Sequence, residues 1–175
     1  MRLKEGVAVL AILERISDLF KKGDNMTLSE RIQDGVICFL EEESRDGALK
    51  KLIEALADAG EVIEKDLFYE ALLKREEIVS TGIGMEVAIP HAKLPSFNRF
   101  FLAVGLQKSK EGIEWNSLDG TPVRLIFMIG GPTNRQTEYL KILSHLTAAI
   151  KDEDRRKKLI TATTKEEVIS LFEGC

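Results

Sequence analysis

Hydrophobic residues recur at three- and four-residue spacing in several stretches of the chain, the pattern of helices with one buried face. The first stretch is 7–22, and it ends at the polar run KKGDN. The same spacing predicts helices at 47–59 and 65–75, and two more that end near 150 and 172. We therefore expect residues 1–25 to form a helical extension ahead of a domain at 26–175.

Short runs rich in β-branched and aromatic residues predict strands between these helices, at 36–40, 85–89, 100–106 and 123–129. The last run is almost continuously apolar, which is typical of a central strand buried on both faces. Strands that alternate with helices indicate an α/β fold. We expect a three-layer sandwich in which a mixed sheet is flanked by helices on both faces.

Two helix starts are predicted from capping-box spacing, in which a threonine hydroxyl and a Gln or Glu three residues later satisfy backbone N–H groups. Thr133 with Gln136 would open the helix that ends near 150. Thr164 with Glu167 would open the last helix.

Charge and cysteine content narrow the function classes. The net charge of −4 and the pI near 5.4 argue against a nucleic-acid partner, which would require a basic face. No apolar run approaches the roughly 20 residues that span a bilayer, so we expect no direct membrane insertion and no cleaved signal. Cys38 and Cys175 form no CxxC, which favours a reducing, cytoplasmic setting. Cys38 lies in a predicted strand and is expected to pack in the core.

The motifs of several enzyme classes are missing from the chain. There is no GxxxxGK[ST] and no GxSxG, and GIGMEV has Val87 where a dinucleotide fingerprint requires its third glycine. His91 and His145 are 54 positions apart and have no cysteine partner at zinc spacing. We therefore predict no cofactor and no metal.

One histidine lies in an unusual setting, the stretch STGIGMEVAIPHAKL at 80–94. His91 could simply bond a backbone carbonyl at the end of a strand. However, Gly82 and Gly84 permit close backbone approach, Pro90 fixes the backbone ahead of the ring, and Ala92 leaves space beside it. A rigidly held histidine at the mouth of a sheet suits a nucleophile or a general base.

A histidine nucleophile must be neutral, and an imidazole with a pKa of about 6.5 is mostly neutral at cytoplasmic pH. Such a ring can carry a phosphoryl group if cations or N–H donors face the phosphoryl oxygens. Arg75 could supply the cation, or could be a solvated arginine at a helix C-terminus. The hydroxyls of Ser80 and Thr81 could donate to the phosphoryl group, or could cap a turn.

Three segments together resemble one known family. KREEIVSTGIGMEVAIPHAKL (74–94) resembles the active-site segment of the enzyme IIA domains of the bacterial sugar phosphotransferase system, of the fructose/mannitol class that includes the nitrogen-related regulatory proteins. GIEWNSLDGTPVRLIFMIGGP (112–132) resembles that family's strand–turn–strand block, and 137–172 resembles its C-terminal helices. The likeness runs from about Leu28 to Phe172.

The resemblance implies that His91 accepts a phosphoryl group from the carrier protein HPr and passes it on. In the transport proteins of the family the recipient is a IIB domain and finally a sugar. Arg75 matches the arginine that steadies the phosphoryl group in this family. The implied fold, a mixed sheet between helical layers, agrees with the fold predicted from the hydrophobic pattern.

The chain departs from the family at its second active-site histidine, where Tyr139 stands instead. His145 lies six residues further along the helix, about 240° around its axis, so it is expected to face elsewhere. The Tyr139 hydroxyl can bond a phosphoryl oxygen but is uncharged at pH 7. The change bears on the rate of transfer more than on phosphorylation itself.

Three functions fit this resemblance. A regulatory phosphocarrier of the nitrogen-related kind is favoured, because AIPHAKL is near the pattern of those proteins and the sequence holds no IIB or IIC segment. The second is a free-standing IIA component of a sugar uptake system. The third is a degenerate homologue that binds partners without accepting phosphate.

Overall fold

The computed structural model describes residues 26–175, so the predicted extension 1–25 and its helix lie outside the described residues. The helices in this part of the chain are α2 (Leu28–Asp34), α3 (Arg45–Asp58), α4 (Lys65–Ile78), α5 (Gln136–Ile150), α6 (Glu153–Thr161) and α7 (Lys165–Ser170). The strands are β1 (Val36–Leu40), β2 (Gly82–Gly84), β3 (Val87–Ala88), β4 (His91–Lys93), β5 (Phe101–Gln107) and β6 (Leu125–Gly131).

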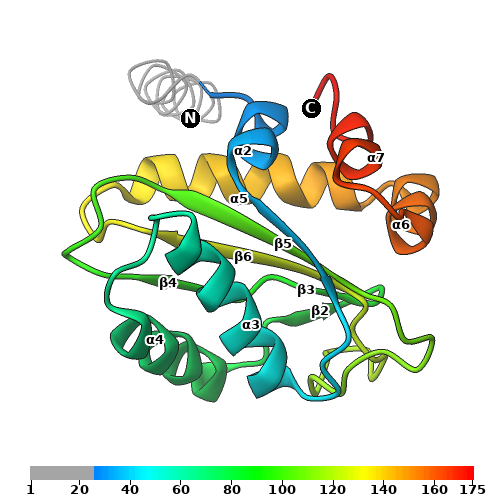
Figure 1. Cartoon of the computed structure of the whole chain (residues 1–175), viewed down its shortest axis with the longest axis horizontal. Coiled ribbons are helices and arrows are strands. Elements are labelled where there is room, and N and C mark those ends of the chain that lie inside the picture. Colours follow the sequence, from blue (N-terminus) through cyan, green and yellow to red (C-terminus); the bar gives the residue numbers. More distant parts are fainter. Residues whose placement is uncertain (1–25) are drawn as a thin grey trace, which may run out of the picture.

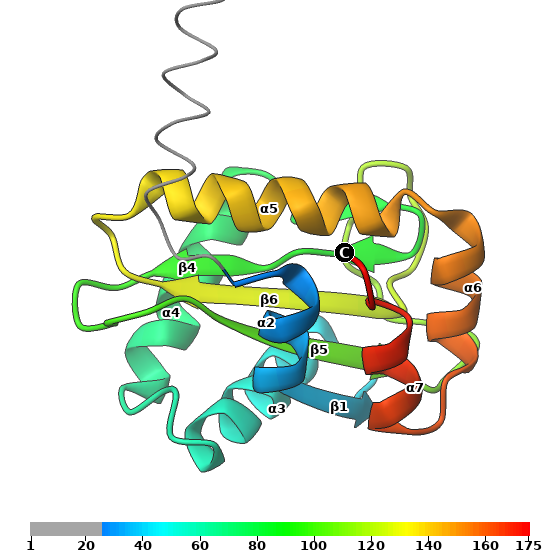
Figure 2. The ribbon, with the colours of Figure 1, turned by 90° about the horizontal axis from the view of Figure 1, so that it is seen from above.

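The strands form one mixed sheet in the order β1-β5-β6-β3-β2, with β4 also paired to β6. β1 runs parallel to β5, β5 antiparallel to β6, and β3 and β4 both parallel to β6. Figure 2 shows β4, β6, β5 and β1 side by side in that order. The predicted mixed sheet is therefore confirmed.

The sheet separates two apolar cores, as the alternating side chains of its central strands require. Leu125, Phe127 and Ile129 of β6 pack into the core beneath α2, α5, α6 and α7. Ile126 and Met128 point the opposite way, into the core beneath α3 and α4. Figure 1 shows α5 crossing one face of the sheet and α3 with α4 on the other. The predicted three-layer sandwich is confirmed, and β6 is buried along its whole length.

The strand that carries His91 is a continuation of β3 beyond a break at 89–90. Pro90 has no N–H for a ladder, but its carbonyl accepts from the N–H of Ile129 at 2.9 Å. β4 then resumes pairing, with His91 opposite Ile129. On its other side β4 has no partner strand among residues 26–175. His91 therefore stands at an edge of the sheet, beside α4.

The predicted strand at 85–89 is wrong in its first half. Met85 and Glu86 have φ of 58° and 63° and form the turn between β2 and β3. Two successive positive φ values are the geometry of a type I′ hairpin turn, which Asn-Gly usually fills. Met-Glu lacks that signature, so the sequence pattern concealed the turn.

The Thr133–Gln136 capping box is also wrong. α5 begins at Gln136 behind Arg135, which makes no side-chain cap. The Gln136 side chain instead bonds Lys93, whose Nζ donates to its Oε1. At Thr164 the hydroxyl does accept from the N–H of Glu167 as predicted, although the Glu167 carboxylate bonds the N–H of Thr163 instead of Thr164.

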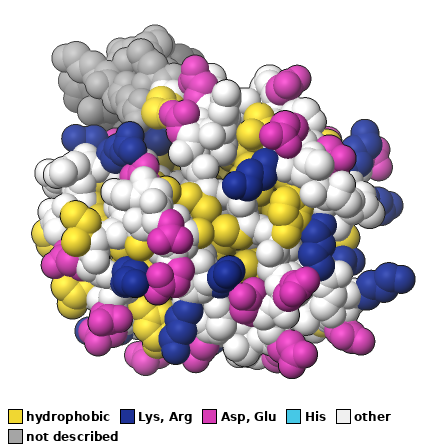
Figure 3. Space-filling view, viewed as in Figure 1, with side chains coloured by type: hydrophobic (Ala, Val, Ile, Leu, Met, Phe, Trp, Pro, Cys, Tyr) yellow, Lys and Arg dark blue, Asp and Glu magenta, His cyan; other side chains and the backbone are white. Residues whose placement is uncertain are grey.

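The surface over α3 and α4 mixes charges of both signs with small hydrophobic patches, and no large basic area is visible on this face (Figure 3). Such a mixture gives no electrostatic footprint for nucleic acid on this side of the molecule. Within residues 26–175 no helix is long and apolar enough to cross a membrane.

Candidate phosphoryl-acceptor site

Two hydrogen bonds fix the imidazole of His91. Its Nδ1 lies 2.9 Å from the carbonyl oxygen of Ile89, and its Nε2 lies 3.1 Å from the Nε of Arg75. A carbonyl only accepts and a guanidinium only donates, so Nδ1 carries the proton and Nε2 keeps its lone pair. The site thus holds a neutral imidazole whose free lone pair points toward a cation.

The surroundings of His91 favour this neutral form. Burial lowers the pKa of the ring, the hydrogen bond to Ile89 opposes that shift, and the charges of Arg75 and Lys93 lower the pKa further. The charge of Glu76 raises the pKa, and its effect is the smallest of those named here. The ring is therefore uncharged at neutral pH.

Arg75 lies in the last turn of α4 and is half-buried. Its Nη1 donates to the carbonyl of Val79 at 2.9 Å, which anchors the guanidinium at the end of its own helix. Arg75 therefore lies at a helix C-terminus, where a positive charge is favourable, and contacts His91 from that position. The structure thus places Arg75 both at the helix end and beside His91, and its binding of a phosphoryl group stays a prediction.

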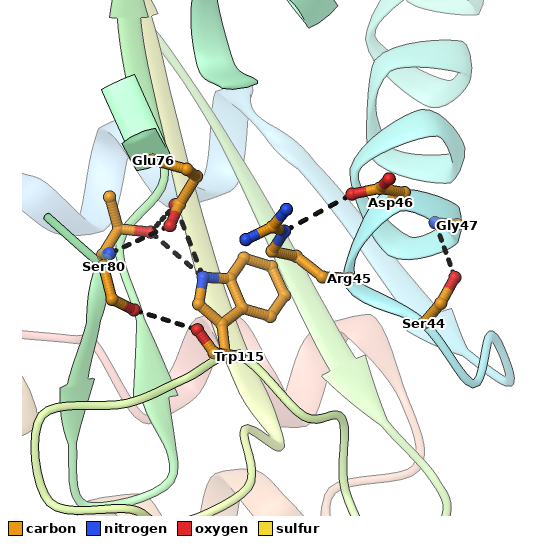
Figure 4. Close-up of polar contacts among 8 residues, drawn as sticks. Ser44, Arg45, Asp46, Gly47, Glu76, Ser80 and Trp115 are labelled. Carbon is orange, nitrogen blue, oxygen red and sulfur yellow. Dashed lines mark hydrogen bonds and ion pairs between the residues drawn. The ribbon is translucent and has the colours of Figure 1, made fainter. Parts of the chain in front are cut away.

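A buried carboxylate ties the loop after α4 to that helix. Glu76 accepts from the N–H of Thr81 at 3.1 Å, from the Thr81 hydroxyl, and from Trp115 Nε1 at 3.4 Å. The Ser80 hydroxyl donates to the carbonyl of Trp115 at 2.9 Å. Figure 4 shows Glu76 and Ser80 converging on Trp115. The hydroxyls of Ser80 and Thr81 thus donate to Trp115 and to Glu76 of α4.

The glycines of this loop are required by close contacts. A Cβ added to Gly82 would lie 2.6 Å from the Oγ of Ser117. Gly84 has φ of +97°, and a Cβ there would lie 2.7 Å from a carboxylate oxygen of Asp119. That carboxylate accepts from the N–H of Met85 at 2.9 Å and so holds the hairpin turn. The segment STGIG is therefore a rigid support for the strand that leads to His91.

Tyr139 of α5 also contacts the imidazole of His91. The two ring centroids are 5.4 Å apart, and the Tyr139 ring also stacks on Phe100 at 6.2 Å. Burial raises the pKa of the Tyr139 hydroxyl, so it is uncharged at pH 7. His145 is exposed and lines a different surface hollow together with Cys175. The expectation that His145 faces away from His91 is confirmed.

Sequence reasoning missed Lys93. Its Nζ lies 4.1 Å from the centroid of the Tyr139 ring and donates to Gln136. Burial lowers the pKa of Lys93. The signal was present, since side chains two apart on a strand share a face and His91 is two residues before Lys93.

Curated proteins similar to this chain include fructose-specific phosphotransferase components and nitrogen regulatory proteins. A fructose-specific EIIA component of Haloferax volcanii is 37% identical over 125 residues, covering 71% of this chain and 80% of that protein. A nitrogen regulatory protein of Bradyrhizobium diazoefficiens is 32% identical over 140 residues, covering 79% and 89%. The fructose-specific EIIABC component of Bacillus subtilis is 34% identical over 133 residues, and the chain spans only 21% of its length.

Solved structures show the same fold. The nitrogen regulatory protein IIA-Ntr of Neisseria meningitidis superposes with a TM-score of 0.72 at 27% identity, covering 83% of this chain and 94% of that one. Mannitol IIA of Escherichia coli, in its complex with phosphorylated IIB, gives 0.67 at 21% identity, covering 81% and 96%. The sequence model described as phosphoenolpyruvate-dependent sugar phosphotransferase system, EIIA 2, matches residues 31–175. The chain therefore belongs to the EIIA 2 family of the phosphoenolpyruvate-dependent sugar phosphotransferase system.

Proposed function

We propose that this protein is a histidine phosphocarrier that accepts a phosphoryl group from HPr on Nε2 of His91, and that its role is regulatory. The observation that carries the proposal is the state of His91: a neutral ring whose free Nε2 faces the guanidinium of Arg75 at 3.1 Å. Membership of the EIIA 2 family supports phosphoryl transfer as the chemistry.

The transfer begins with the lone pair of Nε2. It attacks the phosphorus of the donor's phosphohistidine, a new N–P bond forms, and the old N–P bond breaks with its electron pair returning to the donor ring. Positive charge that develops on the His91 ring is stabilised by the Ile89 carbonyl, which accepts the Nδ1–H. Arg75 loses its acceptor when Nε2 is phosphorylated, so its N–H turns to a phosphoryl oxygen.

The likeness to nitrogen regulatory proteins supports the regulatory role. The Bradyrhizobium protein is matched over 89% of its length, and the Neisseria IIA-Ntr structure gives the higher TM-score of the two structures compared. A phosphoryl group changes the charge beside the exposed surface around His91, which is a means to make or break a partner contact.

A second candidate is a sugar-specific IIA component, and the identity of 37% to the fructose-specific protein of Haloferax favours it. In that role the recipient of the phosphoryl group is a IIB domain. The mannitol IIA structure in complex with phosphorylated IIB shows that a protein of this fold docks such a domain.

The acceptor assignment is tested by incubating the chain with phosphoenolpyruvate, enzyme I and HPr, and measuring acid-labile phosphate. We expect label on the wild type and on His145→Ala, and none on His91→Ala. Label that persists on His91→Ala contradicts the assignment of the site. Absence of label from the wild type would instead indicate a degenerate homologue that only binds partners.

The two roles are separated by adding a purified IIB domain of the fructose/mannitol class to the labelled chain. Transfer of the label to IIB within seconds would support the sugar-specific candidate. Retention of the label on His91 under the same conditions is the result expected of the regulatory role.

A further inference from the structure

A second cation, Lys93, lies near the imidazole of His91. Lys93 is two residues beyond His91 on β4, and both side chains contact the ring of Tyr139: the imidazole centroid at 5.4 Å and the Lys93 Nζ at 4.1 Å. At about 3.3 Å per strand residue, the two side chains start about 6.6 Å apart on one face. A lysine stem of four methylenes spans that separation.

The present partners of Lys93 are uncharged. They are the face of the Tyr139 ring and the side-chain oxygen of Gln136, and no carboxylate within residues 26–175 pairs with Lys93. Arg75 is likewise held by a carbonyl and by the neutral His91 ring. Glu76, the carboxylate next to Arg75, is occupied by Thr81 and Trp115. Two cations, neither of which forms an ion pair with a carboxylate within residues 26–175, thus lie near one neutral imidazole.

Two such cations near His91 suit a negatively charged group that is present only once His91 has been phosphorylated. A phosphoryl group carries its negative charge on three oxygens, and Arg75 lies on only one side of Nε2. Tyr139, which also contacts the imidazole, is neutral and supplies no charge. Gln136 is exposed and its amide is readily hydrated, so little opposes the release of Lys93 from it.

We propose that Lys93 is a second phosphoryl-binding residue, whose ammonium moves from Gln136 and the Tyr139 ring onto an oxygen of the phosphoryl group on His91. Arg75 and Lys93 then both bind that group, and Lys93 supplies the positive charge that Tyr139 cannot. This inference rests on the proposed phosphocarrier function.

The test compares Lys93→Met, Lys93→Arg and the control Lys151→Met. Methionine keeps an apolar stem against Tyr139 but removes the charge, and Lys151 is an exposed lysine at the far end of α5, so both methionine variants change the net charge equally. Phosphorylated HPr is mixed with each protein, and the single-turnover rate of label transfer to His91 is measured together with the melting temperature.

We expect Lys93→Met to transfer at least about tenfold more slowly, since removal of one donor to a developing anion commonly has this effect or a larger one. Lys93→Arg should stay within about threefold of the wild type, and Lys151→Met should match it. The phosphoryl group on Lys93→Met should also take up its proton at a higher pH, read from its ³¹P shift, because a nearby positive charge has been lost.

A Lys93→Met variant that folds, transfers as fast as Lys151→Met and shows the wild-type ³¹P titration overturns the assignment of Lys93 alone. Wild-type protein that accepts no phosphate contradicts the proposed function, and the role of Lys93 with it. The two failures are therefore distinguishable.

Discussion

The imidazole of His91 has neighbours of two kinds. On the α4 side, Arg75 bonds Nε2 directly, and its helix is tied to the following loop by the buried carboxylate of Glu76. On the α5 side, Tyr139 supplies a ring surface, and Lys93 rests on it with only an exposed glutamine to bind. Arg75 is held by hydrogen bonds to His91 and Val79, whereas the proposed role of Lys93 requires its side of the ring to rearrange during transfer.

Under the proposed function, this difference would account for phosphoryl transfer with Tyr139 at the position where the family resemblance implies a second histidine. In the proposed transfer, the attacking lone pair is oriented by the Ile89 carbonyl and by Arg75, neither of which belongs to α5. The α5 side affects how well the transferred group is stabilised. Changes to the two sides should therefore have effects of different size.

The largest effect is expected from Arg75→Met. It removes the cation next to Nε2, and loss of one such donor typically reduces a rate by about 10²–10³-fold. Single-turnover transfer from phosphorylated HPr measures it, with Lys74→Met as the control because Lys74 is the exposed neighbour on the same helix. A rate for Arg75→Met within threefold of that control would mean that Arg75 does not bind the phosphoryl group.

Next in size is a loss of stability from Thr81→Val, which keeps the shape of the side chain but removes its hydroxyl. Glu76 loses a donor and Trp115 Nε1 loses an acceptor at 3.2 Å, both in a buried position. We expect the free energy of unfolding, measured in urea, to fall by about 1–3 kcal/mol. Thr161→Val, whose exposed hydroxyl bonds only carbonyls of its own helix, should change it by less than about 0.5 kcal/mol. Equal effects would contradict the proposed anchor.

A smaller effect is expected from Tyr139→Phe. The contacts of Tyr139 with His91, Phe100 and Lys93 are made by its ring, which phenylalanine keeps. The transfer rate should change by less than about threefold, the range of one weak neutral hydrogen bond. A tenfold fall would show instead that the hydroxyl binds the phosphoryl group and would group Tyr139 with Arg75 in the comparison.

The smallest effect concerns pH. The pKa of His91 is lowered by burial and by its two cations, so we expect an NMR titration of His145→Gln, which leaves His91 as the one histidine of the chain, to give a pKa below the 6.5 of a free imidazole. The unfolded chain then binds more protons than the folded one, so stability is lost as the pH falls from about 6.5 through the folded pKa. A titration at or above 6.5 would contradict the neutral, desolvated ring.

The sequence predicted the layers of the fold well, because long apolar runs and helical spacing report burial directly. The sequence-based predictions failed where a side chain bonds a residue that is far away along the chain. Gln136 bonds Lys93 instead of capping its own helix, and the turn at Met85 and Glu86 is held by Asp119 and Thr121 from another loop. Such contacts join residues more than 30 positions apart and leave no local pattern.

The site divides in the same way. The sequence singled out His91 by its rigid setting and left two interpretations open for Arg75. The family resemblance favoured the phosphoryl-binding interpretation of Arg75 and drew attention to Tyr139. The sequence offered two interpretations for Ser80 and Thr81, and the structure places their hydroxyls in contacts with Trp115 and Glu76. Lys93 was overlooked because strand β4 is only three residues long, too short for its alternation to be recognised.

The central claim is that Nε2 of His91 is the atom that receives the phosphoryl group. Long-range ¹H–¹⁵N spectra of the protein phosphorylated through HPr identify the modified nitrogen directly. We predict that phosphorus is coupled to Nε2 of His91 while Nδ1 keeps its proton against the Ile89 carbonyl. Phosphorus on Nδ1, or on His145, would contradict this account of the site.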